Sequence, residues 1–119
     1  MKKGLKNPSL LNLIKFLEKK SKENEAPVWK ALAKLLSSSR RLMRRVNVSK
    51  IARYAKEGEI IAVPGKVLGA GSLSSKLTVA AYKFSAQARK KILDSGGECI
   101  SFYELIERNP KGKNVKILG

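Results

Sequence analysis

The sequence predicts a mixed α+β protein in which a basic, helical N-terminal half is followed by a compact core of irregular strand-strand-helix units. Two observations carry this prediction. Apolar residues recur at helical spacing before residue 58, whereas short runs rich in β-branched and aromatic residues dominate after it. The chain has 119 residues, so we expect a single domain over 1–119, with a basic helical lead-in over 1–58 and an α/β core over 59–119.

Two amphipathic helices are predicted in the first part of the lead-in. Asn7 and Pro8 are typical of a helix start, with Asn as the cap and Pro at the first helical position. Four apolar residues at helical spacing continue this helix: Leu10, Leu13, Ile14 and Leu17. We expect a charged loop over 21–25, a second helix opened by Pro27, and an end to that helix at the serines 37–39.

A basic segment follows the second predicted helix. Between residues 40 and 56 there are seven basic residues and no acid: Arg40, Arg41, Arg44, Arg45, Lys50, Arg53 and Lys56. In the front half of this segment, apolar residues do not recur at a regular spacing. Its back half predicts a short helix that is capped near Asn47 and stopped by Gly58.

The first strands are predicted immediately after Glu59. The run "EIIAVPGKVL" predicts a strand, a turn at Pro64 and Gly65, and a second strand. The run "KLTVAAYKF" is rich in Val, Thr, Tyr and Phe and predicts a buried or half-buried strand.

The remaining core elements alternate between helix and strand. Ser85 caps a helix over "AQARKKILDS", which Gly96 and Gly97 end, and "ECI" predicts a short strand. The spacing of Ser101 and Glu104 is that of a capping box, so "FYELIER" is predicted to be helical. A turn over 109–112 then leads to the closing strand "NVKIL".

The charge of the chain points to a polyanionic partner. Twenty-six Lys and Arg against nine Asp and Glu give a formal net charge of +17. A compact protein with this charge repels itself unless a polyanion supplies negative charge, and nucleic acid is the commonest such partner. Arginine presents a planar fork of donors that matches phosphate oxygens, so the irregular arginine segment suits an irregular RNA surface.

An anionic membrane is the second class of partner to consider, and the sequence argues against it. The N-terminus has a positive start and an apolar run, as a signal peptide has, but Asn12 and Lys15 interrupt the run and no small-residue cleavage site follows. No apolar stretch approaches the roughly 20 residues that a membrane span needs. We therefore expect a cytoplasmic protein with no membrane partner.

No catalytic, cofactor or metal site is predicted. The chain lacks His, which removes the usual general base and most zinc ligand sets, and the lone Cys99 is expected in the core. Lys66 is followed by Val67 rather than Ser or Thr, so the glycine stretch 63–72 fails as a phosphate loop and is interpreted as turns. Glu57 and Glu59 are interpreted as turn residues rather than as a metal or acid–base pair. We expect no small-molecule substrate.

Several motifs in chain order resemble one family. They are "NPSLLNLI" (7–14), "VWKALAKLL" (28–36), "RRVNVSKIARYA" (44–55), "VPGKVLGAGSLSSKLTVAAYKFSAQARKKILDSGG" (63–97) and "ISFYELIERNPKGKNVKIL" (100–118). Over essentially its whole length, the chain resembles the archaeal and eukaryotic large-subunit ribosomal protein that is numbered eighteen with the suffix e. Residues 66–97 are also similar to the related large-subunit protein numbered fifteen. Eukaryotic members of the family carry a long basic C-terminal extension that this sequence does not show, so we expect an archaeal member.

The resemblance implies a structural component of the large ribosomal subunit, in the cytoplasm, that binds large-subunit rRNA beside neighbouring ribosomal proteins and has no catalytic role. The family's basic segment corresponds to residues 40–45 here. From the residues themselves we expect phosphate contacts by Arg40, Arg41, Arg44, Arg45, Lys50, Arg53 and Lys66, and by a tail that carries Lys2, Lys3 and Lys6. The alternatives are a non-ribosomal RNA-binding protein or RNA chaperone, a membrane-surface protein that uses its first helix, and an RNA-modifying enzyme that uses Glu57 or Glu59.

Overall fold

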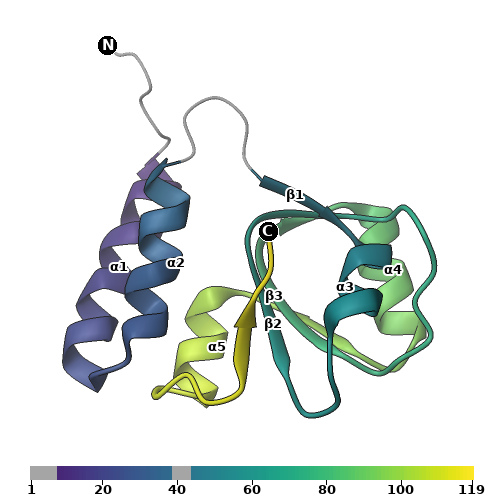
Figure 1. The fold of residues 1–119 in the computed structure, drawn as a ribbon. Coiled ribbons are helices and arrows are strands. Elements are labelled where there is room, and N and C mark those ends of the chain that lie inside the picture. Colours follow the sequence, from purple (N-terminus) through teal and green to yellow (C-terminus); the bar gives the residue numbers. More distant parts are fainter. Residues whose placement is uncertain (1–7, 39–43) are drawn as a thin grey trace.

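A computed structural model describes residues 8–38 and 44–119, and within them the predicted α+β class is confirmed (Figure 1). The helices are α1 (Pro8–Asn24), α2 (Pro27–Ser38), α3 (Val48–Tyr54), α4 (Ala86–Asp94) and α5 (Phe102–Arg108). The strands are β1 (Arg44–Asn47), β2 (Ile60–Leu68), β3 (Thr78–Phe84), β4 (Glu98–Ile100) and β5 (Val115–Ile117).

All the strand pairs of the sheet are parallel. The order is β1-β2-β3-β4, and β5 also pairs with β2. β5 lies beside residues 60–62 of β2 and β1 beside residues 65–68, so the two strands follow one another along the same side of β2. In a parallel sheet all strands end at the same edge. We call this edge, where the strands end, the carboxyl edge, and the opposite one the amino edge.

Helices cover both faces of the sheet, as a parallel sheet requires (Figure 1). On one face, α1, α2 and α5 pack against Ala62, Ala80 and Ile100. On the other, the buried residues of α3 and α4 pack against the alternate positions of the same strands, among them Ile61 and Val79. The sheet thus separates two apolar clusters, and each strand position can be assigned to one face.

The helical hairpin of α1 and α2 is an integral part of this structure. Trp29 is fully buried, and its indole Nε1 donates a hydrogen bond to the carbonyl oxygen of Pro110 at 2.8 Å. Leu17, Leu32 and Leu36 are also fully buried in the cluster that α5 and the sheet complete. The basic lead-in is therefore held to the core by apolar burial.

Several predicted boundaries are confirmed. Pro8 begins α1 and Pro27 begins α2, as their fixed φ predicts. Ser85 caps α4, because its hydroxyl accepts a hydrogen bond from the Ala88 amide at 3.1 Å. Ser101 caps α5 in the same way, with the Glu104 amide as donor at 3.1 Å. The short strands β4 and β5 also lie where they were predicted.

The predicted turn at Pro64 and Gly65 is wrong, because β2 runs through both residues. The pairing of β2 with β3 shifts its register between Val63 and Lys66, and this irregularity accommodates a proline that cannot donate to the ladder. Gly65 is needed there, since a Cβ atom would lie 2.1 Å from the carbonyl oxygen of Arg44. The strand therefore bends at this point and does not reverse.

Other predictions in the lead-in are also corrected. The expected loop over 21–25 is mostly helix, because α1 continues to Asn24. Residues 44–47, where the spacing of apolar residues predicted no helix or strand, form strand β1. Asn47 does occupy the N-cap position of α3, but its side chain makes no cap bond and accepts instead from the Ala70 amide at 3.2 Å. α3 ends at Tyr54, ahead of the predicted stop at Gly58, which has a φ of +85°.

Candidate nucleic-acid interface

Three cations lie in register across three neighbouring strands near the carboxyl edge. Arg45 of β1 is paired with Lys66 of β2, and Lys66 is paired with Lys83 of β3. We call these three residues the basic row. Adjacent strands lie about 4.8 Å apart, and like charges directly opposite one another destabilise a sheet. The arrangement therefore favours an anion that lies across the strands.

The basic row points away from α3 and α4. The next residue along each strand, Val46, Val67 and Phe84, packs into the cluster that α3 and α4 cover. Because successive side chains of a strand alternate between faces, the row faces the other way. Arg45 and Lys83 are exposed and Lys66 is half-buried, so all three can be reached from outside.

A hollow with a cationic rim adjoins the row where β3 and β4 stop pairing. Lys83, Arg89 and Ser101 are among the residues that line it, and its volume is about 330 Å³. The Arg89 guanidinium carbon lies 5.1 Å from the centroid of the Phe84 ring, and the Lys83 ammonium 5.6 Å from that of Tyr82. These cation–π contacts orient both charges at the surface. Sequence reasoning missed Lys83 and Arg89, because only the strand register places Lys83 beside Lys66, and only the fold brings Arg89 to the same hollow as Lys83.

Lys50 and Arg53 form a second basic surface on α3. Both are exposed and lie three residues apart on one side of the helix, while Val48 and Ile51 anchor the other side in the core. Neither cation forms an ion pair with an acid of the described part of the chain. The structure does not bring this pair together with the basic row, since α3 covers the opposite face of the sheet.

Arg44 has a structural contact as well as a predicted binding role. It is half-buried, and its Nη1 donates a hydrogen bond to the carbonyl oxygen of Leu35 at 3.1 Å. This carbonyl lies in the last turn of α2, where a cation also meets the negative end of the helix dipole. Of the other predicted contact residues, Arg40, Arg41, Lys2, Lys3 and Lys6 lie outside the described residues.

The glycine stretch 63–72, interpreted as turns, is a loop only in its second half: residues 63–68 belong to β2, and residues 69–72 form a tightly held loop after it. The Lys91 ammonium donates to the carbonyl oxygens of Gly69 and Gly71, at 2.6 Å and 2.5 Å. Gly71 has a φ of +94°, and a Cβ atom there would lie 2.3 Å from that of Ser49. Lys91 therefore fixes the backbone of this loop against α4.

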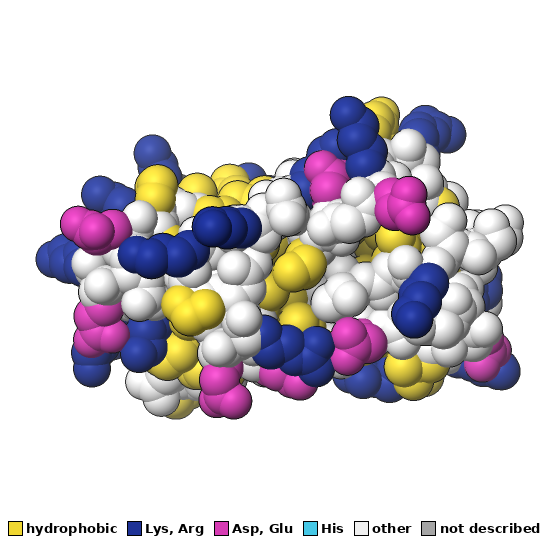
Figure 2. All heavy atoms as spheres, turned by 90° about the horizontal axis from the view of Figure 1, so that it is seen from below, with side chains coloured by type: hydrophobic (Ala, Val, Ile, Leu, Met, Phe, Trp, Pro, Cys, Tyr) yellow, Lys and Arg dark blue, Asp and Glu magenta, His cyan; other side chains and the backbone are white. Residues whose placement is uncertain are grey.

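Acidic residues accumulate around the amino edge, opposite the basic row. Glu59 directly precedes β2 and Glu98 begins β4. Figure 2, a view of the molecule from below, shows acidic side chains spread among basic ones over this face. Arg108 donates to both carboxylate oxygens of Glu98 at 3.1 Å, and this bond holds the pKa of Glu98 below its ordinary value. The amino edge thus carries side chains of both signs, whereas the basic row consists of cations alone.

Glu59 and Cys99 lie in surroundings that do not favour catalytic chemistry. Glu59 is a turn residue, since its carboxylate accepts from the Lys56 amide at 2.8 Å. Among the described residues, no cluster of His, Cys, Asp or Glu is suited to hold a metal ion. Burial raises the pKa of the half-buried Cys99 thiol, which makes it a poor nucleophile.

Membrane binding through the first helix is also disfavoured. The apolar face of α1 is buried in the core, with Leu10, Leu13 and Leu17 at most 5% exposed. Within the described ranges 8–38 and 44–119, no helix has the length and apolarity to cross a bilayer.

The fold and the site together define a class of protein: a small, basic α+β protein whose parallel sheet displays cations at its carboxyl edge. Comparison with known proteins narrows this class. The chain belongs to the family described as "Ribosomal protein 60S L18 and 50S L18e", which matches residues 4–119.

Archaeal relatives agree with this family. "Large ribosomal subunit protein eL18" of Archaeoglobus fulgidus is 50% identical over 112 residues, which cover 94% of this chain and 96% of the relative. The protein of the same name from Methanococcus maripaludis is also 50% identical, with coverage of 94% and 93%. The predicted family and its archaeal branch are thus confirmed, whereas the similarity to the protein numbered fifteen stays a prediction.

Proposed function

We propose that this chain is a structural constituent of the archaeal large ribosomal subunit, in the cytoplasm, and that it stabilises large-subunit rRNA by contacting phosphates. Its relatives carry the name of a large-subunit protein, and its net charge of +17 suits a polyanionic partner. It acts by position and charge, without catalysis.

The observation that carries the phosphate contacts is the register of the basic row. Backbone pairing holds the Cα atoms of Arg45, Lys66 and Lys83 side by side, so no rearrangement of the backbone is needed when an RNA strand binds across them. Phosphates close to the row replace mutual repulsion between cations with attraction. Arg89, at the rim of the adjoining hollow, extends the same surface.

A second contact surface is formed by Lys50 and Arg53 on α3. Because it faces away from the basic row, the chain has cations on both sides of its sheet. A protein with two such surfaces can bind two RNA segments at once and fix their relative position. A structural protein stabilises an assembled particle in this way without catalysis.

The test is a triple variant, Arg45→Gln, Lys66→Gln and Lys83→Gln, with affinity for purified large-subunit rRNA as the readout. Binding should weaken at least tenfold at moderate salt while the circular dichroism spectrum is unchanged. The control removes the same charge elsewhere, through Lys19→Gln, Lys90→Gln and Lys113→Gln. Equal losses in both variants would mean that total charge, not the row, determines binding, and would overturn the proposal.

A non-ribosomal RNA chaperone is the remaining alternative. It is separated from the proposed function by fractionation of cell extract on a sucrose gradient. The proposed function requires this chain in the large-subunit and whole-ribosome fractions at one copy per particle. A chain that sediments only with small RNAs would favour the chaperone.

A further inference from the structure

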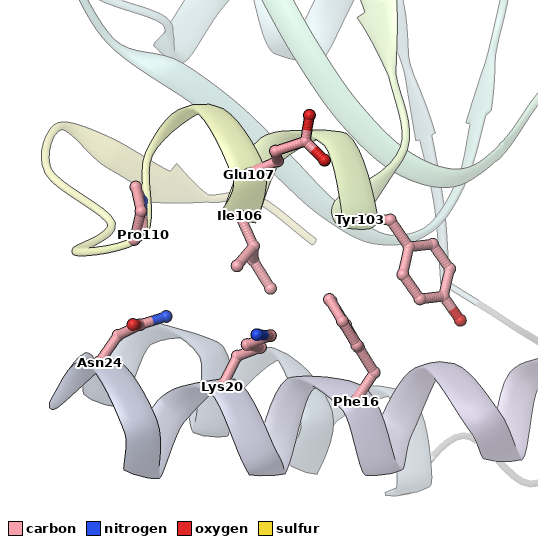
Figure 3. A pocket seen from close by; sticks show the side chains of 7 residues that line it. All are labelled: Phe16, Lys20, Asn24, Tyr103, Ile106, Glu107 and Pro110. Carbon is pink, nitrogen blue, oxygen red and sulfur yellow. The ribbon is translucent and has the colours of Figure 1, made fainter.

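A groove between α1 and α5 remains unused by the RNA-binding surfaces. It has a volume of about 450 Å³ and is open to solvent. Figure 3 shows Phe16 of α1 and Ile106 of α5 directed into the space between the two helices, with Tyr103 at one end. The Phe16 and Tyr103 ring centroids lie 4.6 Å apart.

The groove has the composition of a docking site for a side chain. Ile106 is 3% exposed and forms an apolar floor, while Tyr103 leaves 45% of its surface exposed. Tyrosine at the rim of an apolar hollow is typical of protein interfaces, because it contributes a large apolar area and a polar hydroxyl. Within the described part of the chain, the Tyr103 hydroxyl makes no hydrogen bond.

The cations that surround the groove are already neutralised or hydrogen-bonded. Lys20 is paired with Glu23 at 3.1 Å, and Lys111 donates to the carbonyl oxygen of Asn24 at 3.0 Å. Arg108 is bound by two carboxylates at once, those of Glu98 and Glu104. The charges of Lys20 and Arg108 are thus matched by carboxylates, whereas Lys111 keeps its positive charge beside a neutral carbonyl.

Glu107 is the unmatched charge of this groove. It lies on the α5 side, and its carboxylate is directed away from α1 (Figure 3). No ion pair or hydrogen bond of Glu107 is found among residues 8–38 and 44–119. Glu18, Glu25 and Glu57 also form no ion pair within the described residues, but Glu107 is the one of these four that lines this groove, where it would repel the phosphates of RNA.

We propose that the groove binds a basic segment of another protein of the large subunit. An apolar side chain of that segment packs over Ile106, against the touching rings of Phe16 and Tyr103, and a neighbouring Lys or Arg pairs with Glu107. This inference rests on the proposed function, since it is assembly into the subunit that places other basic proteins against this side of the chain.

The test uses purified large subunits that contain the full chain with the photoreactive residue p-benzoylphenylalanine at position 103. After irradiation, we expect cross-links to a segment of another ribosomal protein that carries Lys or Arg within a few residues of the linked position. Adding Glu107→Lys should reduce the yield of these cross-links at least fivefold. Glu57→Lys reverses a charge on an exposed loop outside the groove and should leave the yield unchanged.

The same probe at Tyr54 is the matched control, because Tyr54 is also 45% exposed but follows Arg53 on α3. At this position we expect cross-links to rRNA. Suppose that position 54 gives cross-links to rRNA. The groove proposal alone would then be overturned if position 103 gave cross-links to rRNA, cross-links to a second copy of this chain, or no cross-links. Absence of rRNA cross-links from position 54 would count against the proposed function instead.

A measurement on the unmodified chain avoids any effect of the probe on assembly. Carbodiimide labelling of carboxylates, read by mass spectrometry, should modify Glu107 at least fivefold less in the subunit than in the free protein. Glu107 labelled equally in both states would overturn the proposal.

Discussion

Arg45 and Lys66 lie directly opposite one another on the parallel strands β1 and β2, and both carry a positive charge. We expect such a pair to weaken the free protein and to strengthen its complex with an anion. The pair therefore affects the stability of the free protein and its affinity for RNA in opposite directions. Both quantities can be measured.

Arg45→Thr should stabilise the free protein while it weakens RNA binding. The substitution removes a like-charge pair on an exposed strand position and introduces a residue that favours strands, so the free energy of unfolding should rise by about 0.2–1 kcal/mol. Urea denaturation at low salt measures the change. A clear loss of stability would show that the two charges do not repel one another at this spacing.

The salt dependence of binding should report the number of phosphates that the basic row contacts. For each contact removed, the slope of log affinity against log salt falls by about 0.7–0.9. The triple variant at positions 45, 66 and 83 should therefore reduce the slope by about 2–3. Filter-binding titrations over a range of potassium chloride give both slopes. An unchanged slope would mean that these cations contact no phosphate.

Gly65→Ala should disrupt the junction that positions the row. Its methyl group would meet the Arg44 carbonyl oxygen at 2.1 Å, so β1 must separate from β2 or the strand must distort. We expect a loss of about 1–3 kcal/mol in the free energy of unfolding, as for other overpacked sites. Gly58→Ala serves as a comparison without steric contact, since no atom lies within 4 Å of its added Cβ and only its φ of +85° is unfavourable. If Gly65→Ala is the milder of the two, the close approach of β1 and β2 is not what requires glycine.

Ser85→Ala should destabilise the protein by about 1 kcal/mol, because α4 loses the side-chain bond that satisfies the Ala88 amide. Thermal unfolding by circular dichroism measures this effect. Ser74→Ala, in an exposed part of the loop between β2 and β3, is the control and should change little. Equal effects of the two substitutions would refute a special role for the cap.

The ion pair of Glu98 and Arg108 should make stability depend on pH in acid. Because Arg108 lowers the pKa of Glu98 in the folded state, the stabilisation is present above the ordinary value of 4.5 and is lost as the pH falls through the lower, folded value. Arg108→Met should flatten this part of the curve of unfolding free energy against pH. A curve of unchanged shape would show that the pair does not persist in solution.

Local signals in the sequence were sufficient for the elements that local chemistry determines. Pro8 and Pro27 begin helices because their φ is fixed, and Ser85 and Ser101 cap helices because their hydroxyls satisfy free amides. Long-range pairing was not predictable in this way. Strand β1 has only four residues and is stabilised by pairing with residues of β2 that lie 21 positions further along the chain, beyond α3.

The same distinction separates the site residues that were found from those that were missed. Arg45 and Lys66 were predicted because each stands in a conspicuous basic or turn-like segment. Lys83 was missed because, in the sequence, it is a single charge within an apolar strand. Its significance comes from the register of three strands, which no local pattern of residues encodes.

The central claim is that the row of Arg45, Lys66 and Lys83 lies against RNA phosphates. The most direct test is an electron cryo-microscopy structure of the large subunit that contains this chain. We predict that at least two of the three side chains have a nitrogen within about 3 Å of a phosphate oxygen. A row that faces solvent, or that is covered by another protein, would contradict the claim.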